Sequence, residues 1–298
     1  MTFLRFTVLV MLMSVLVACS SQDAPADNGA SGDNTSETVT TNNTNPENAG
    51  LVARVNGTGI TLETYNDAFE RRSVYANAAS ESALRQQVLD ELVEQELIRQ
   101  GAPGLGISVT DEDIEAEIAA QREIAGSEDA WLASLEQNDY TQEEWFEAQR
   151  DVLITQGVSN ILIEPYLGEI EQVNARHILV RTEATANEVM DRLEAGEGFA
   201  TLAAEYSLDT TTANNGGNLG WFARNELYQQ ALEDRAFELE IGAISYVTTS
   251  LGYHVVQTMA REVREVEFER LAVLSENVFN NWLNTQYRNA TIEVYVQW

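Results

Sequence analysis

The clearest pattern of apolar and polar positions in this 298-residue chain lies between Asn174 and Arg261. Residues 175–180, Ala-Arg-His-Ile-Leu-Val, form a short apolar run bounded by polar positions, which is typical of a buried strand. Residues 252–257, Gly-Tyr-His-Val-Val-Gln, have the same character and predict a second strand. The two histidines of the chain, His177 and His254, lie one in each run.

Between these two strands the pattern changes from helix to bend and back. Two apolar stripes with helical spacing predict two helices. The first stripe consists of Val189, Met190 and Leu193, and the second of Phe199, Leu202, Ala203 and Tyr206. Residues 216–222 hold three glycines in five positions beside two aromatic residues expected to face a pocket, so we interpret them as a bend rather than an ordinary core strand. A helix over 229–237 and a strand over 244–247 follow. The predicted order is strand, two helices, strand, helix, two strands, with the bend as the second extended element.

Residues 51–172 open with an alternating strand over 51–57 and continue as amphipathic helices. The residues expected to cap helix N-termini are Thr61, Ser80, Thr110 and Thr141. Two of these caps begin capping boxes, Thr110 with Asp113 and Thr141 with Glu144. Three buried stripes are predicted before Pro165 ends the last helix; they are Leu84, Val88, Leu92 and Leu97, then Ile114, Ile118 and Ile124, then Trp145, Phe146, Val152 and Leu153.

The C-terminal residues predict one more helix and one more strand. Leu271, Leu274, Val278 and Trp282 share one face of a helix, and residues 291–297 alternate as a strand would. A lone helix and strand need an apolar surface to cover their stripe.

The first 50 residues have a different composition. Residues 1–18 carry one charge and an apolar core too short to cross a bilayer comfortably, which is typical of an export signal. They end in Leu-Val-Ala-Cys, which looks like a bacterial lipobox, so Cys19 would become the lipidated first residue of the mature chain; the alternative is an ordinary signal peptide with a chance cysteine. Residues 19–50 are rich in small polar residues and predict a flexible tether.

Charge and cysteine content exclude several classes of protein. The formal net charge is −31, and the chain contains no lysine, so nucleic acid is an improbable partner. Cys19 is the only cysteine, and no intramolecular disulfide can form.

Three ordered motifs carry a resemblance to the parvulin family of peptidyl-prolyl cis-trans isomerases. They are Ala-Arg-His-Ile-Leu-Val at 175–180, Gly-Gly-Asn-Leu-Gly-Trp-Phe at 216–222 and Gly-Tyr-His-Val-Val at 252–256. The resemblance implies a small antiparallel sheet surrounded by helices over residues 173–262.

Residues 51–172 are similar to the N-terminal helical domain of SurA and of PrsA-type foldase lipoproteins. The residues that carry this similarity lie near 52–57, at 89–98 and at 105–114. It implies that residues 263–298 return to this domain and that their strand pairs near 52–56. We therefore expect an α+β protein in which the parvulin-like unit is inserted in a mainly helical, SurA-like domain, completed by the C-terminal helix and strand.

By this resemblance the histidines would lie paired beneath a substrate pocket. The resemblance implies a catalytic set of His177, Asp209, His254 and Thr249. It also implies an apolar cup for the prolyl ring, formed by Leu219, Phe222, Leu227, Leu232 and Phe237. Asp209 takes the position where some parvulins have cysteine, which argues against a nucleophile. We expect burial beside neutral imidazoles to raise the pKa of Asp209.

Other roles for these residues stay open at this point. The alternative for each histidine is an ordinary structural residue of a strand whose ring nitrogens are hydrogen-bonded. The alternative for Asp209 is an acid of a polar turn without a catalytic role. A metal site of His177, His254 and Asp209 fits the residue types, but no pair has helical spacing and no cysteine joins them. The resemblance implies no metal and no cofactor.

The predicted function is isomerisation of X-Pro bonds in exported, unfolded polypeptides, with chaperone activity, by a protein anchored to the bacterial cell envelope. An alternative is a catalytically weak, ATP-independent holdase, and another is an envelope scaffold indifferent to proline. The clients, the membrane leaflet and the oligomeric state do not follow from the sequence.

Overall fold

The computed structural model of the chain describes residues 40–41, 46–74 and 80–297. The predicted signal segment 1–18 and the lipidation site Cys19 lie outside these residues. Within them, no helix has both the length and the apolar character needed to cross a membrane.

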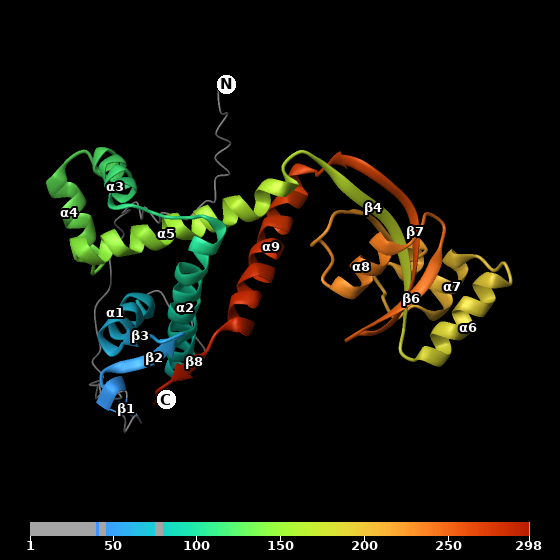
Figure 1. The fold of residues 1–298 in the computed structure, drawn as a ribbon, viewed down its shortest axis with the longest axis horizontal. Helices are drawn as coiled ribbons and strands as arrows, with labels where there is room; N and C mark the ends of the chain where they lie inside the picture. Colours follow the sequence, from blue (N-terminus) through green and yellow to red (C-terminus); the bar gives the residue numbers. More distant parts are fainter. Residues whose placement is uncertain (1–39, 42–45, 75–79, 298) are drawn as a thin grey trace, which may run out of the picture. The chain divides into compact units, whose positions relative to one another are not determined.

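A three-stranded antiparallel sheet joins the two ends of the described chain. Its central strand β2 (Leu51–Val55) pairs with β3 (Thr58–Thr61) on one side and with β8 (Ile292–Val294) on the other. In the second pair Ala53 lies opposite Val294, and Val55 lies opposite Ile292. The predicted return of the C-terminal strand to residues 52–56 is confirmed, and the insertion of the intervening unit follows from it (Figure 1).

Two predictions for the chain ends need correction. The C-terminal strand breaks at Tyr295, and its last part, β9 (Val296–Gln297), pairs with β1 (Thr40–Thr41). A 3-10 turn, η1, follows at Pro46–Asn48. The predicted structureless tether is therefore wrong for these residues near its C-terminal end, because a partner strand far along the chain supplies hydrogen bonds that composition does not reveal.

Helices cover this small sheet. In chain order they are α1 (Leu62–Ser73), α2 (Glu81–Gly101), η2 (Ala102–Leu105), α3 (Asp111–Ala125), α4 (Glu128–Gln137), α5 (Gln142–Ile163), η3 (Glu164–Tyr166) and α9 (Phe268–Asn289). The four predicted N-caps are confirmed, and the capping boxes at Thr110 and Thr141 are complete. Because each cap satisfies a free backbone N–H, these residues fix where the helices begin.

The core of the helical part forms where α2, α5 and α9 meet the sheet. Leu84, Val88 and Leu97 are buried as predicted. Ile114 and Ile118 are buried, but Ile124 is 84% exposed, so that part of the prediction is wrong. Ile124 lies in the last turn of α3, beyond the packing of α4 and α5. Of the predicted third stripe, Trp145, Phe146 and Leu153 are partly buried and pack against the cluster that Ile114 and Ile118 form, whereas the most buried apolar residues of α5 are Ile154, Val158 and Ile163.

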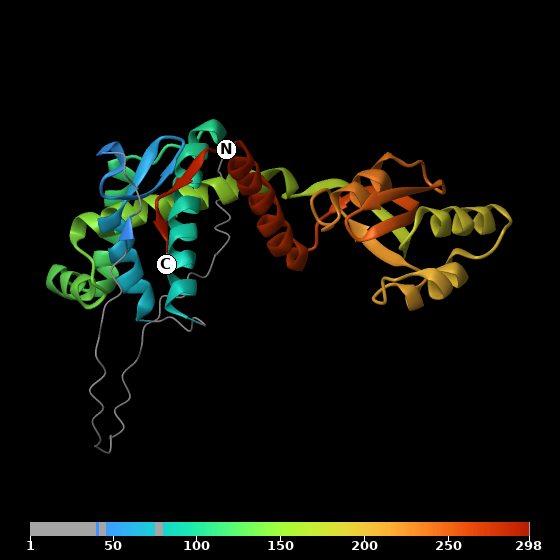
Figure 2. The same ribbon diagram turned by 90° about the horizontal axis from the view of Figure 1, so that it is seen from below.

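The second structured part is a four-stranded antiparallel sheet with the order β5-β4-β7-β6. Its strands are β4 (Glu169–Val180), β5 (Asn218–Phe222), β6 (Ile244–Thr249) and β7 (Gly252–Glu265). Its helices are α6 (Glu183–Glu194), α7 (Phe199–Tyr206), η4 (Ala213–Asn215) and α8 (Gln230–Glu238). The apolar clusters place α6 and α7 on one face and α8 on the other, as Figure 2 shows from a second direction.

The glycine-rich segment 216–222 is part strand and part bend. Residues 218–222 pair with β4, as the second extended element of the predicted order requires, and only Phe222 among them is buried, so β5 is not an ordinary core strand. The predicted positive φ angles are present at Gly216, Gly217 and Gly220. The register of β4 against β5 shifts between Ala175 and Arg176, which is how the strand accommodates the extra twist.

Candidate active site

The two long central strands bring both histidines to the same face of the sheet. In the pairing of β4 with β7, His177 lies opposite Val256 and Leu179 lies opposite His254. Alternation along the strands puts both imidazoles on the face that carries α8. The rings lie nearly parallel, with centroids 5.2 Å apart and planes 14° apart, and the two residues are only 4% and 1% exposed.

The imidazoles are the middle members of a continuous chain of hydrogen bonds. Asp209 Oδ2 lies 2.8 Å from His177 Nε2. The two Nδ1 atoms of His177 and His254 lie 2.9 Å apart. Thr249 Oγ1 lies 2.8 Å from His254 Nε2. The four predicted catalytic residues are thus neighbours in the fold, although 77 positions separate the first, His177, from the last, His254, in the sequence.

This chain admits one arrangement of protons when both histidines are neutral. An ionised Asp209 only accepts, so His177 carries its proton on Nε2 and its Nδ1 must accept from His254. The Nε2 of His254 then accepts from the Thr249 hydroxyl, which itself accepts from the Leu251 amide at 3.1 Å. Since each donor meets an acceptor, the array fixes both tautomers and both ring orientations.

The electrostatics of the site favour these neutral rings. Burial lowers the pKa of His177, against the opposing effect of Asp209. Burial and the neighbouring His177 lower the pKa of His254 to about 4. For Asp209, burial raises the pKa, but hydrogen bonds from Thr212, from His177 and from the Thr211 amide outweigh it, and the pKa falls to about 2. The expected upward shift for Asp209 is therefore wrong, because donors surround the carboxylate.

Two residues of the site escaped the sequence reasoning. Thr212 donates to Asp209 Oδ2 at 2.6 Å, the same oxygen that lies 2.8 Å from His177 Nε2, and its hydroxyl oxygen lies beside the imidazole, 3.3 Å from that nitrogen. Gly217 accepts at its carbonyl from the His177 amide at 2.8 Å, and a Cβ added to it would lie 2.0 Å from the His177 carbonyl oxygen. Only glycine tolerates that approach, so the glycine-rich segment positions His177. A position three residues after Asp209, typical of a side-chain-stabilised turn, was the available signal for Thr212.

The five residues predicted to form the prolyl cup belong to one apolar cluster. Leu219 and Leu227 are partly buried at its edge, whereas Phe222, Leu232 and Phe237 are 2%, 4% and 6% exposed. The last three are buried, and the rings of Phe222 and Phe237 meet at 70°. Phe222 is thus more buried than the sequence interpretation expected, and its role in the prolyl cup stays a prediction.

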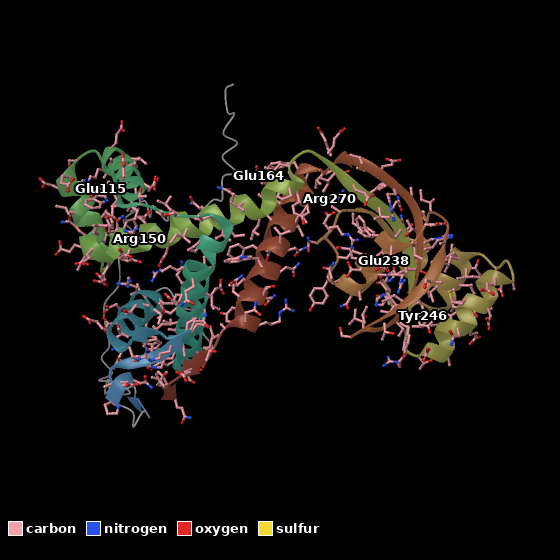
Figure 3. The ribbon with its side chains drawn as sticks, in the orientation of Figure 1. Glu115, Arg150, Glu164, Glu238, Tyr246 and Arg270 are labelled. Atoms are coloured by element: carbon pink, nitrogen blue, oxygen red, sulfur yellow. The ribbon has the colours of Figure 1, made fainter. Side chains whose placement is uncertain are left out.

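Hydrogen bonds to a buried carboxylate hold the loop that carries Leu227 in place. Glu233 is fully buried in α8 and accepts from the backbone amides of residues 225, 226 and 227, each at 2.9 or 3.0 Å. On the other side of the loop, Glu226 pairs with Arg270 of α9, which also donates to Gln172 (Figure 3). The sequence reasoning missed Glu233, because an acid on an amphipathic helix ordinarily faces solvent.

The site has no feature of bond-making chemistry. The acidic and imidazole groups hold one another, and among the described residues no group of three or more acidic, histidine or cysteine side chains is placed to hold a metal ion. An apolar cluster beside a fixed polar array offers surfaces of the kind that bind and orient a peptide group.

Comparisons with known proteins agree with this geometry. Residues 152–262 match the family model of the PPIC-type PPIASE domain, and residues 28–159 match that of the SurA-like N-terminal domain. The chain is 32% identical over 227 residues to the foldase protein PrsA of Caldanaerobacter subterraneus subsp. tengcongensis, covering 70% of this chain and 72% of that one. It is 28% identical over 256 residues to the foldase protein PrsA of Geobacillus kaustophilus, covering 83% of each. A crystal structure of the peptidylprolyl isomerase PrsA from Bacillus anthracis matches with 22% identity over 67% of this chain and 96% of that one, with a TM-score of 0.42.

Fold, motif order and family match define a parvulin-type peptidyl-prolyl isomerase joined to a SurA-like helical region. More particularly, the chain belongs to the family of PrsA foldases.

Proposed function

We propose that the chain isomerises X-Pro bonds of unfolded, exported polypeptides over the array of Asp209, His177, His254 and Thr249. The prolyl ring would rest against Leu219 and Leu227, with the buried part of the same apolar cluster beneath it. The observation that carries the proposal is the unbroken hydrogen-bond chain next to this cluster.

The chemistry is rotation about a bond, and no bond is made or broken. Amide resonance sets a barrier of about 18–20 kcal/mol, and X-Pro bonds isomerise unaided in roughly 10–100 s. Twisting the bond ends the resonance and reduces the charge separation of the amide, so an apolar cup favours the twisted state over the planar one. A thousandfold acceleration needs only about 4 kcal/mol.

In this mechanism the array acts by staying fixed. Because both imidazoles are neutral and oriented, they keep the pocket floor free of a desolvated positive charge. Asp209 is the charged member and its side chain is 22% exposed, so its field would act on the carbonyl group of the bound peptide bond. A preorganised polar environment requires no reorganisation while the bond turns.

We further propose where the protein lies in the cell and what each of its domains does. Residues 1–18 would direct export, and Cys19 would carry a lipid that anchors the chain to the cell envelope through residues 19–50. Residues 51–172 and 263–298 would form the chaperone domain that holds unfolded clients, and residues 173–262 the isomerase domain. The short strand at residues 40–41 supports a tether that ends before residue 40.

The test is exchange NMR on a short Ala-Pro-Phe peptide with the full chain in mild detergent, which needs no coupled protease. We expect the His254→Ala variant to lose roughly tenfold to a hundredfold in rate, since it interrupts the array between His177 and Thr249. Tyr253→Phe is the matched control, because Tyr253 lies one position away and on the opposite face of β7.

A parent chain that does not accelerate exchange would refute the isomerase mechanism proposed for this array. If the same chain suppressed client aggregation, the holdase would be the correct description. Equal rates for the parent and the folded His254→Ala variant would remove His254 from the mechanism.

A further inference from the structure

The loop that carries Leu227 has two supports, and they come from different parts of the chain. Residues 223–229 join β5 to α8, and Leu227 lies at the edge of the apolar cluster proposed to take the prolyl ring. From inside the isomerase part, Glu233 accepts from three backbone amides of this loop. The second support is α9, whose other contacts belong to the core of the helical part (Figure 1). Residues outside 173–262 therefore hold a loop of the isomerase site.

An arginine of α9 binds the carboxylate of Glu226 through two of its nitrogens. Arg270 Nε lies 2.9 Å from Glu226 Oε1, and its Nη2 contacts Oε2. The side chains of Glu226 and Arg270 are only 10% and 22% exposed. Glu226 Oε2 also accepts from the amide of Ala223, at the start of the loop. Because a bidentate pair fixes both distance and orientation, Arg270 sets the position of this loop relative to α9.

The same guanidinium group is also bound to the central strands of the isomerase sheet. Nη1 of Arg270 donates to Gln172 Oε1 at 3.0 Å. Gln172 lies fully buried in β4, and its Nε2 donates to the carbonyl groups of Arg264 and Glu265 in β7, at 3.1 Å each. Each polar atom of the Gln172 side chain thus has a partner, and such a buried, satisfied network is rigid. Arg270 therefore joins the loop to a fixed point of the sheet.

Asn225 is the second place where α9 contacts the loop. Its backbone has a φ of +69°, a conformation that residues other than glycine keep only where their surroundings fix it. Its Nδ2 donates to the Tyr166 hydroxyl at 2.5 Å. Its carbonyl oxygen accepts from Asn277 at 3.0 Å, and its Oδ1 accepts from Asn281 at 3.2 Å. Tyr166 belongs to η3, and both other partners belong to α9, so all three lie outside the isomerase segment.

We propose that Arg270 of α9 is a positioning residue of the isomerase site, because it holds residues 223–227 in the conformation that keeps Leu227 at the edge of the prolyl cup. Asn277 and Asn281 assist it from the same helix. Leu227 would contact the prolyl ring in the planar and in the twisted state alike, so its displacement weakens binding more than it slows rotation. The inference rests on the proposed function, since it requires the prolyl ring to bind beside Leu227.

The test measures two properties of the Ala-Pro-Phe peptide with the full chain in mild detergent. They are the Kd from a chemical-shift titration and the exchange rate at saturating peptide from exchange NMR. We expect Arg270→Ala to raise the Kd roughly tenfold and to change the saturated rate by less than about twofold. Arg270→Lys should restore only part of the affinity, because an ammonium group cannot reproduce the bidentate geometry.

Arg288→Ala is the matched control for the loss of an arginine from α9. Arg288 is exposed in the last turn of the helix and donates to Thr285, so its removal should leave both properties unchanged. Asn281→Ala is a milder second variant, since the exposed Asn281 donates to the side chain of Asn225. We expect it to raise the Kd by roughly threefold, and this result decides the question if Arg270→Ala does not fold.

A double variant separates positioning from a general loss of stability. Leu227→Ala removes the side chain through which Arg270 is proposed to act, so the addition of Arg270→Ala should raise the Kd no further. A purely structural role for Arg270 would raise the Kd by the same factor with and without Leu227, and that result would overturn the inference. An unchanged Kd in Arg270→Ala, with its circular dichroism intact, would also overturn it.

Failure of the isomerase proposal gives a different result. A parent chain that binds the peptide without accelerating exchange would refute the isomerase mechanism, whereas a tenfold loss of binding in Arg270→Ala would still support the positioning role. A parent chain that neither binds the peptide nor accelerates exchange would refute both proposals.

Discussion

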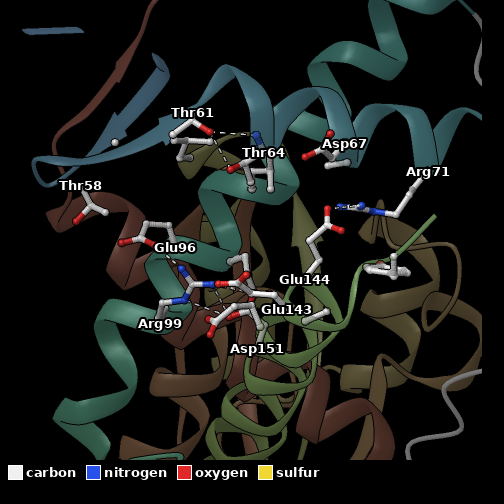
Figure 4. Close-up of a pocket in the computed structure, with 18 residues that line it drawn as sticks. Thr58, Thr61, Thr64, Asp67, Arg71, Glu96, Arg99, Glu143, Glu144 and Asp151 are labelled. Carbon is white, nitrogen blue, oxygen red and sulfur yellow. Dashed lines mark hydrogen bonds and ion pairs between the residues drawn. The ribbon is translucent and has the colours of Figure 1, made fainter. Parts of the chain in front are cut away.

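The isomerase array and the acidic cavity treat their polar groups in opposite ways. At the array, Asp209 and the two histidines satisfy one another through a closed sequence of donors and acceptors. At the cavity of about 430 Å³ that residues of β3, α1, α2 and α5 line, Asp67 and Glu143 make no ion pair and no hydrogen bond with another described residue (Figure 4). The array is therefore fixed in shape and field before a substrate arrives, whereas Glu143 is exposed and its charge is in contact with solvent.

The largest expected effect breaks the array without touching the cavity. Gly217→Ala places a Cβ 2.0 Å from the His177 carbonyl oxygen, so the strand that carries His177 must shift. We expect loss of most isomerase activity, at least roughly a hundredfold, measured by exchange NMR on the Ala-Pro-Phe peptide.

Gly220→Ala is the control for backbone strain. Both glycines have a φ of +75°, but a Cβ on Gly220 would meet no atom within 4 Å. The second variant should lose about 1 kcal/mol of stability and keep its activity. Equal damage in the two variants would show that the left-handed conformation, and not the contact with His177, makes Gly217 necessary.

The next effect concerns the loop that presents Leu227. Glu233→Gln replaces one of two accepting oxygens with a donor that faces backbone N–H groups. We expect the isomerase part to lose about 2–4 kcal/mol in free energy of unfolding, measured by denaturant titration. Glu238→Gln, an exposed position on the same helix, should change it by less than about 0.5 kcal/mol. Equal shifts for both variants would contradict the role of Glu233 as the anchor of the loop.

Acid should lower the stability of the isomerase part before it lowers its activity. The pKa of His254 is about 4 when folded and 6.5 when free, so the unfolded state binds the extra proton first and stability falls as pH drops from 6.5 toward 4. Asp209, with a pKa of about 2 against 3.8, adds its own loss of stability only below pH 3.8. Isomerase activity of the folded chain should therefore stay level from pH 7 to about 5.

The smallest effect lies outside both regions and calibrates the others. Ile124 is 84% exposed and Ile118 is 3% exposed on the same helix. Truncation of Ile124 to alanine should change the free energy of unfolding by less than about 0.5 kcal/mol, and that of Ile118 by about 2–4 kcal/mol. A large effect at Ile124 would indicate that its face of α3 is covered in solution.

The sequence by itself determined the local and the repeated features of this protein. The N-caps at Thr61, Ser80, Thr110 and Thr141 follow from hydrogen bonds within four residues, and the strand and helix order of the isomerase part follows from periodicity. The three motifs indicated the family and contain the two histidines, and the resemblance to that family added Asp209 and Thr249. The return of the C-terminal strand also followed from the resemblance.

Only the tertiary structure decided the environment of each side chain. The pKa of Asp209 is lowered and not raised as expected, because Thr212, His177 and the Thr211 amide all donate to its carboxylate in the folded chain. Glu233 became a buried anchor because the chain wraps a loop around it, and the strand at residues 40–41 formed because Val296 and Gln297 lie beside it. Burial and satisfaction of polar groups depend on contacts between residues distant in sequence, and those contacts exist only once the chain has folded.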